Sequence, residues 1–325
     1  MNVLSLFDGI SVNYLALKNL NINIKNYYAS EINKYAIGIS KYNFPNIKHI
    51  GDAKEIDVNN LETIDLIAGG SPCQNFSFIG KKNGMITKNK LEITTLEEYL
   101  KFKEKGYEFE GQSYLFWEYV RILKELKPKY FLLENVKMSK KWENVINSVL
   151  GFEPVEINSR FFSAQNRKRL YWIGKLKKSG KYKKVNIEID KLHQNSAAFL
   201  SIKDILEAKV PEKYFNIKNI ERYVPKDWKN YLIIDPYNHK GIKDIKSTTL
   251  RTNYSNGNCW INDKGKLRRL TPLECERLQT LPDHYTKFGI INDKIVKISD
   301  RQRYITIGNA WTLKVIEYIY NYLLI

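Results

Sequence analysis

The residue with the clearest chemical potential is Cys73, in the segment Gly-Gly-Ser-Pro-Cys-Gln-Asn-Phe-Ser at 69–77. The apolar run 64–68 precedes this segment. We therefore expect Cys73 on a loop just beyond a strand, where α/β sheets bind ligands. Pro72 stiffens the backbone next to the sulfur. Cys73 is a candidate nucleophile, but a single cysteine is more often a small buried apolar residue, so the interpretation depends on other residues.

Two further segments offer a proton donor and a pair of cations. The uncharged run 130–133 ends at Glu134. A glutamate there, near apolar neighbours, is suited to donate a proton, the alternative being an acid at a helix N-terminus. Arg167 and Arg169 alternate at the start of an expected strand, so they point to the same side. Such a pair clamps a phosphate or a carbonyl oxygen, unless it is simply a solvated basic edge.

Three expected strand ends near the N-terminus carry residues suited to a nucleoside. Phe7 and Gly9 form a glycine turn between a strand and a helix, which presents backbone N–H groups to a ligand. Glu31 follows the second strand, where a carboxylate binds ribose hydroxyls, and Asp52 follows a third glycine turn. The three ends together predict a nucleoside-type cofactor pocket. The glycine spacing is not a complete GxGxxG, which counts against NAD.

A sheet is needed to position these residues. The first 175 residues alternate apolar, β-branched runs with amphipathic stretches. This pattern predicts an α/β fold with a mostly parallel sheet flanked by helices. We expect strands at 3–7, 27–30, 64–68, 130–133 and 170–173, and helices at 12–20, 32–42, 96–105, 115–124 and 142–150. Residues 176–265 are irregular and rich in Lys and Asn, which predicts a smaller lobe, and helices are expected again at 268–281 and 312–324.

Composition narrows the class of protein. The 325 residues include 43% hydrophobic and 27% charged residues, as in ordinary globular proteins. Three cysteines without CxxC spacing and four scattered histidines predict no disulfide framework and no metal site. The net charge of +18 favours a polyanionic partner, although an AT-rich genome would also enrich lysine. We expect no signal peptide and no membrane span, and hence a cytoplasmic protein.

Taken in order, these segments resemble the cytosine-C5 DNA methyltransferase family over nearly the whole chain. Each motif is weak alone, but the ordered set is highly specific. The Phe-Asp-Gly-Ile and Ala-Ser-Glu variants look more like the phage-borne and vertebrate de novo branches. The matching segments are Phe7–Gly9, Pro72-Cys73-Gln74, Glu134-Asn135-Val136, Gln165-x-Arg167-x-Arg169, Arg269–Pro272 with Glu274-Cys275, and Gly308-Asn309.

The resemblance implies a Rossmann-like S-adenosylmethionine-dependent methyltransferase domain, formed by 1–175 plus 299–325, and a smaller target-recognition domain at 176–298. It implies methyl transfer to C5 of a cytosine flipped out of DNA. Cys73 would attack C6 as a thiolate, and Glu134 would protonate N3. Arg169 would bind O2, and Arg167 would hold the surrounding backbone.

The resemblance also implies the ligands and their residues. S-adenosylmethionine is the expected cofactor, S-adenosylhomocysteine its product, and no metal is expected. Double-stranded DNA is the expected partner of a monomer, with a cognate restriction endonuclease as a second candidate. The cofactor residues would be Phe7, Gly9, Glu31, Ile32, Asp52, Ala53, Pro72, Leu115 and Asn309. The DNA-contacting residues would be Gln74, Ser77, Lys81, Lys82, Gln165, Thr249 and Arg251.

One departure from the family lies between residues 74 and 114, which is about twice as long as the family's mobile loop. We expect an enlarged closing element that contacts DNA phosphates, the alternative being a surface insertion without a role. Other readings of the whole chain are an RNA (tRNA) cytosine-C5 methyltransferase and a catalytically silent DNA-binding relative. A nucleotide-binding oxidoreductase fits the fold but not the Cys-Glu-Arg order.

Overall fold

The computed structural model describes residues 1–73, 75–76, 84–194, 200–252 and 258–325. Gln74, Ser77, Lys81 and Lys82, all predicted to contact DNA, lie outside these ranges. Within the described residues, the largest sheet has eight strands in the order β3-β2-β1-β4-β5-β7-β6, with β8 paired to β7. Their bounds are β1 Asn2–Leu6, β2 Asn26–Ser30, β3 Lys48–Gly51, β4 Leu66–Gly70, β5 Tyr130–Val136, β6 Val155–Asn158, β7 Lys168–Leu176 and β8 Tyr182–Lys184.

The strand directions confirm the predicted α/β class. Strands β3, β2, β1, β4 and β5 run parallel, so their carboxyl ends meet at one edge of the sheet. Strand β7 runs antiparallel to β5, so its first residues reach that same edge. This arrangement brings the end of β5, which carries Glu134, beside the start of β7, which carries Arg169.

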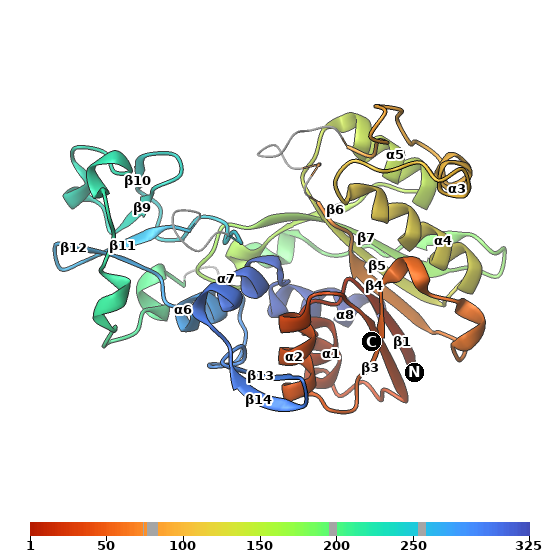
Figure 1. The fold of residues 1–325 in the computed structure, drawn as a ribbon, viewed down its shortest axis with the longest axis horizontal. Coiled ribbons are helices and arrows are strands. Elements are labelled where there is room, and N and C mark those ends of the chain that lie inside the picture. The colour runs from red at the N-terminus through yellow and green to blue at the C-terminus, as the bar shows by residue number, and fades with distance from the viewer. Residues whose placement is uncertain (74, 77–83, 195–199, 253–257) are drawn as a thin grey trace.

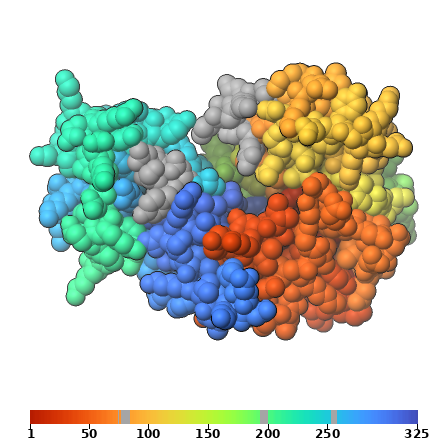
Figure 2. All heavy atoms as spheres, viewed as in Figure 1, coloured from red at the N-terminus to blue at the C-terminus, as the bar shows by residue number. Residues whose placement is uncertain are grey.

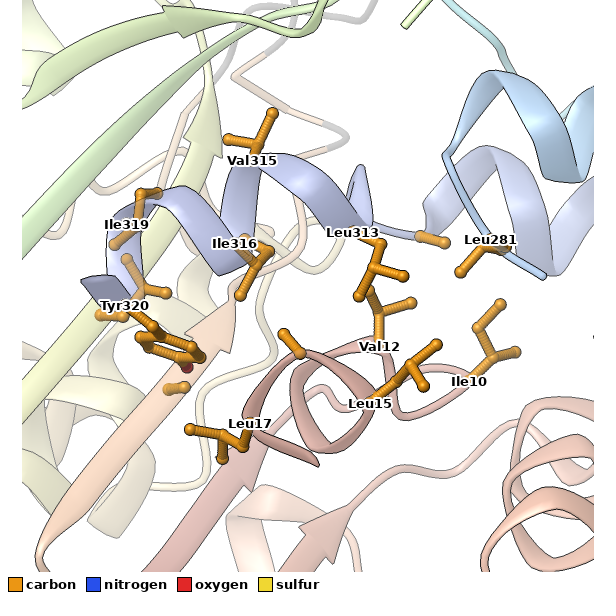
Figure 3. Packing of buried hydrophobic residues seen from close by; sticks show 14 of the residues in the cluster. Ile10, Val12, Leu15, Leu17, Leu281, Leu313, Val315, Ile316, Ile319 and Tyr320 are labelled. Carbon is orange, nitrogen blue, oxygen red and sulfur yellow. The ribbon is translucent and has the colours of Figure 1, made fainter. Parts of the chain in front are cut away.

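Helices cover both faces of the sheet (Figure 1). On one face, α8 packs against α1, and Figure 3 shows Leu313 and Ile316 of α8 facing Val12 and Leu15 of α1. The other face carries a second apolar cluster that includes Trp117 and residues of α3, α4 and α5. The bounds are α1 Val12–Asn19, α2 Lys34–Asn43, α3 Leu96–Glu104, α4 Phe116–Leu126, α5 Lys140–Leu150 and α8 Leu313–Leu323.

A second region, residues 200–252 and 258–269, contains a four-stranded sheet, β10-β9-β11-β12, and is followed along the chain by two helices and a hairpin. The strands are β9 Ile233–Asp235, β10 Lys240–Ile242, β11 Trp260–Asp263, β12 Lys266–Arg269, β13 Phe288–Ile291 and β14 Lys294–Lys297. The helices are α6 Pro272–Leu278 and α7 Asp300–Asn309. Short 3₁₀ turns occupy Ala53–Glu55, Val58–Asn60, Ser113–Leu115, Ser159–Phe161, Asp190–Gln194, Ile202–Ile205, Glu212–Tyr214, Ile220–Arg222 and Trp228–Asn230.

One element prediction, a helix over 268–281, is wrong at its start. Arg268 and Arg269 belong to β12, where they pair with β11. The helix begins only at Pro272, because Thr271 caps it and Glu274 bonds back to the Thr271 backbone N–H. The two arginines that were expected to begin the helix therefore end strand β12.

Packing bears on the predicted division into two domains, which stays a prediction. Strand β8 joins the large sheet, and the following residues up to Leu192 pack on the apolar cluster of its α1 face. Leu281, Tyr285 and Ile298 belong to the same cluster, and the β13–β14 hairpin lies against α2. Segments on both sides of the predicted 176–298 unit therefore pack on the larger one.

The insertion between Cys73 and α4 is a packed element over its described part, 84–112. Met85, Ile93 and Tyr99 are buried in the cluster on the α4 face. Buried Glu118 of α4 accepts hydrogen bonds from Tyr99 and Lys103 of α3 and joins the two helices. Residues 84–112 are therefore packed on the α4 face, and whether the insertion closes on DNA or has no role stays a prediction. No helix among the described residues is long and apolar enough to cross a membrane.

Candidate active site

A cavity of about 530 Å³ opens at the carboxyl edge of the parallel strands. Its walls come from loops after β1, β2, β3, β4 and β5, from the start of β7 and from the segment between α7 and α8. All of the residues predicted to act in catalysis or to bind the cofactor line it. They are Cys73, Glu134, Arg167, Arg169, Phe7, Gly9, Glu31, Ile32, Asp52, Ala53, Pro72, Leu115 and Asn309.

The turn after β1 has an unusual backbone. Phe7, Gly9 and Ser11 have φ values of 56°, 60° and 59°, in the left-handed region that favours glycine. A bulky residue such as Phe7 adopts this conformation only where the surrounding structure enforces it. Here the backbone N–H of Asp8 donates to the carbonyl of Ser30 at 3.0 Å. The strained turn lines the cavity with Phe7, Asp8 and Gly9.

The carboxylate of Glu31 is held by backbone donors. The N–H of Gly9 donates to Oε2 at 2.9 Å, and the N–H groups of Ile32 and Asn33 donate to Oε1 at 2.9 Å. Each carboxylate oxygen has more than one acceptor site, so the group can still accept from hydroxyls of a ligand. Asp52 caps the turn that follows β3 and pairs with Lys54 at 3.2 Å.

Asp8 is a cavity residue that sequence reasoning did not single out. Its carboxylate accepts from Tyr27 Oη at 2.7 Å and from Ser11. Burial raises the pKa of Asp8, an effect that the hydrogen bonds oppose and that the charge of Glu31 reinforces. Its place between Phe7 and Gly9 in the Phe-Asp-Gly turn could have indicated Asp8, but only those two neighbours were predicted to contact the cofactor.

Cys73 lies three positions beyond Gly70, the last residue of β4, and is half-buried. Burial raises the pKa of its thiol above the usual value, and the charge of Glu134 adds to this. Arg169 and Arg167 act in the opposite direction but do not reverse it. The thiol is therefore protonated at neutral pH in this conformation.

Both carboxylate oxygens of Glu134 have a donor. Nε of Arg169 lies 3.0 Å from Oε1, and Nε1 of Trp311 donates to Oε2 at 3.1 Å. Glu134 is only 9% exposed, so the ion pair is largely shielded from water. Trp311 was not among the predicted site residues.

Arg167 is buried and donates three hydrogen bonds to backbone carbonyls. Its guanidinium donates to the carbonyl oxygens of Leu250, Gly308 and Ala310 at 3.0, 3.1 and 3.1 Å. Burial lowers the pKa of Arg167 to about 9, and the neighbouring charge of Arg169 contributes. The side chain thus remains cationic at neutral pH and ties the second region to the cavity wall.

The residues predicted to touch DNA are placed differently. Gln165 is fully buried, donates to the carbonyl of Leu278 at 3.1 Å and accepts from the N–H of Leu250 at 2.8 Å. The predicted contact of Gln165 with DNA is therefore wrong for this structure, because backbone groups of Leu278 and Leu250 already use both ends of its side-chain amide. Thr249 is half-buried, and its hydroxyl donates to the carbonyl of Asn166 at 2.6 Å.

Arg251 is half-buried in the second region. Its guanidinium lies 4.3 Å from the centre of the Tyr237 ring and 4.0 Å from Asp235. Within the described residues, no cluster of three or more His, Cys, Asp or Glu side chains could hold a metal ion.

Comparison with known proteins identifies the family of the chain. The family model described as C-5 cytosine-specific DNA methylase matches residues 1–324. The chain belongs to this family. It is a DNA cytosine-5 methyltransferase, as the sequence resemblance indicated.

Two curated methyltransferases are similar to this chain along most of their length. The orphan methyltransferase M.SPRI of Bacillus phage SPR is 29% identical over 89% of this chain and 68% of its own. The type II methyltransferase M1.ScrFI of Lactococcus lactis subsp. cremoris is 28% identical over 98% of this chain and 76% of its own. The S. pombe Dnmt2 methyltransferase structure shares the fold, with a TM-score of 0.68 at 19% identity over 100% of this chain and 98% of that chain.

Proposed function

We propose that this methyltransferase transfers a methyl group from S-adenosylmethionine to C5 of a cytosine flipped out of double-stranded DNA, through a covalent Cys73–C6 adduct. One observation carries the proposal. The thiol of Cys73, the carboxyl group of Glu134 paired with Arg169, and the carboxylate of Glu31 held by backbone N–H groups share a single cavity. Figure 2 shows the second region, in green and cyan, on one side of the molecule and the yellow and orange part of the first region on the other, and we propose that the duplex lies between them.

The cavity fits the cofactor. Apolar Phe7, Ile32 and Leu115 suit an adenine ring, and Glu31 keeps acceptor sites for ribose hydroxyls. Ile32 is 64% exposed, as expected of a side chain that awaits an apolar partner. Asp52 and Asn309 add polar groups to the same wall. When bound, S-adenosylmethionine supplies a methyl group that its sulfonium has already activated.

The side chains divide the proton and electron movements among themselves. The proton of the Cys73 thiol passes to the Glu134 carboxylate, which hands it on to N3 of the ring as Sγ forms its bond to C6. Arg169 holds the ring carbonyl O2, where negative charge would otherwise build. After C5 has received the methyl group, it loses its proton to a base. The C6–S bond then breaks, and the N3 proton returns to Glu134.

Binding of the base has to change the state of Cys73. The thiol is protonated before the base is bound, and Glu134 is the nearby charge that disfavours its ionisation. A proton held between Glu134 and N3 of the bound base would offset that charge, so the thiolate would form only where the base is bound.

We further propose that the protein is a monomer that acts in the cytoplasm with the nucleoid. Arg251 and Thr249 would lie close to DNA, and a restriction endonuclease is a candidate partner.

The test is bisulfite sequencing of a random-sequence plasmid library incubated with the protein and S-adenosylmethionine. We expect protected cytosines in one recurring context, and none with Cys73→Ser. Cys275→Ala is the matched control, because Cys275 is buried outside the cavity. Complete conversion by a sample that binds S-adenosylhomocysteine would contradict the proposal, and the same assay on total RNA would then test an RNA substrate.

A further inference from the structure

We propose that Trp311 is a positioning residue for the proton donor Glu134. Its indole N–H holds the carboxylate oxygen that Arg169 does not, and this fixes the plane of the carboxyl group against the incoming base. The inference rests on the proposed function, since it concerns the step in which Glu134 protonates the ring.

The geometry gives each oxygen of Glu134 a separate donor. Arg169 Nε lies 3.0 Å from Oε1, and Trp311 Nε1 lies 3.1 Å from Oε2. The terminal torsion of a glutamate side chain is broad, so one donor alone leaves the carboxyl plane free to swing. Donors on both oxygens remove this freedom. A proton donor must lie within about 2.6–3.2 Å of its acceptor, so a fixed plane matters for transfer to N3.

The backbone leaves room for this contact at one place. Gly70 ends β4 directly opposite Glu134 of β5. A Cβ at Gly70 would lie 2.7 Å from Glu134 Oε2 and 3.0 Å from Trp311 Nε1. Both distances are below ordinary van der Waals contact, so any larger residue would push the two groups apart. The glycine permits the indole to reach the carboxylate.

The backbone around Trp311 is held on both sides. The carbonyl of Ala310 accepts from Arg167 at 3.1 Å and from Gln279 Nε2 at 2.9 Å. On the other side, the Thr312 hydroxyl donates to Gln279 Oε1 at 2.7 Å and bonds Ser159 at 2.8 Å. The indole is therefore presented from a fixed backbone.

The variant Trp311→Phe keeps an aromatic ring and removes the N–H donor. A hydrogen bond to a charged group is worth enough to change a rate about 10- to 100-fold when it acts in the transition state. We expect kcat for methyl transfer to plasmid DNA to fall by about this factor, with the KM values for DNA and for S-adenosylmethionine within about twofold of wild type. Trp311→His, whose ring carries an N–H, should recover part of the loss.

Two comparisons separate positioning from general damage. Trp172→Phe is the matched control, because its indole N–H also bonds a side chain, Asn147 at 2.8 Å, but lies outside the cavity. It should lower thermal stability and leave kcat unchanged. In a Glu134→Gln background, Trp311→Phe should add little further loss, because the group that it positions is already disabled.

The outcomes distinguish this inference from the proposed function. A wild-type protein that methylates no DNA would refute the proposed function. If the wild-type protein methylates DNA and the Trp311→Phe variant has the same kcat, with or without a raised KM, the positioning role alone is refuted. If Trp311→Phe does not fold, Gly70→Ala provides the second variant, since its Cβ displaces the same contact, and an unchanged kcat there would also refute it.

Discussion

Replacing Arg167 with methionine would keep the aliphatic part of the side chain and remove the guanidinium. The three carbonyls that it serves belong to Leu250, Gly308 and Ala310. The carbonyl of Ala310 keeps a second donor, Gln279 Nε2 at 2.9 Å. The carbonyls of Leu250 and Gly308 lose the hydrogen bond that Arg167 gives them. A buried acceptor left without a partner costs about 1–3 kcal/mol.

The cost is partly offset, because burying a cation is itself unfavourable. That burial is what lowers the pKa of Arg167 to about 9. We therefore expect Arg167→Met to reduce the free energy of unfolding by about 2–4 kcal/mol. Gly308 and Ala310 flank Asn309 on the cavity wall, so the affinity for S-adenosylhomocysteine should also fall about tenfold, or about 1.4 kcal/mol.

Urea unfolding and calorimetric titration with S-adenosylhomocysteine measure the two effects. Arg303→Met is the matched control: Arg303 is also a buried arginine, bonded to Glu276 at 2.8 Å, and it lies outside the cavity. The control should lose stability but keep its affinity for the product. If both variants are destabilised and both bind S-adenosylhomocysteine like wild type, Arg167 does not shape the cofactor wall, and the reasoning fails.

Three further predictions concern single groups. Glu31→Gln should weaken S-adenosylhomocysteine binding at least about tenfold in the same titration, because the amide N–H₂ would meet the N–H of Gly9 or of its neighbours. Alkylation of Cys73 by iodoacetamide should keep accelerating above pH 9, because the pKa of the thiol is raised, while buried Cys275 stays unreactive. Burial lowers the pKa of His49 to about 4, so the folded state should lose stability as pH falls from about 6.5 to about 4, and His49→Asn should remove this part of the urea-midpoint profile.

Each of these has a clear contrary result. Unchanged product binding by Glu31→Gln would mean that the carboxylate does not serve the cofactor. A plateau in the alkylation rate at pH 8 would mean that the thiol ionises more easily than its surroundings indicate. Identical pH profiles for wild type and His49→Asn would mean that the imidazole is not buried in its neutral form.

The gathering of the site residues at one edge of the sheet was predictable, because parallel strands all end at the same edge. Once Gly9, Glu31, Cys73 and Glu134 each follow an expected strand, a parallel sheet must bring them to one edge. Trp311 was not predictable in this way. It lies in a short link between two helices, and no periodicity indicates where its indole points.

Other misses have identifiable physical causes. The amide of Gln165 is equally suited to DNA and to backbone, and only tertiary structure decides between them. The β13–β14 hairpin did carry a signal that was overlooked. Asn292 and Asp293 have φ values of 50° and 59°, the conformation of a tight hairpin turn that these residue types favour. The packed insertion was missed because its buried residues are spread along irregular chain.

The order of residues around the cavity has a consequence for synthesis on the ribosome. The wall formed by Thr306, Gly308, Asn309, Ala310 and Trp311 emerges after every other cavity residue, and α8 follows it. Until α8 can pack on α1, a nascent chain carries an apolar sheet face open to chaperones and proteases. A chain interrupted before Thr306 would therefore lack this wall of the cavity and the helix that packs on α1.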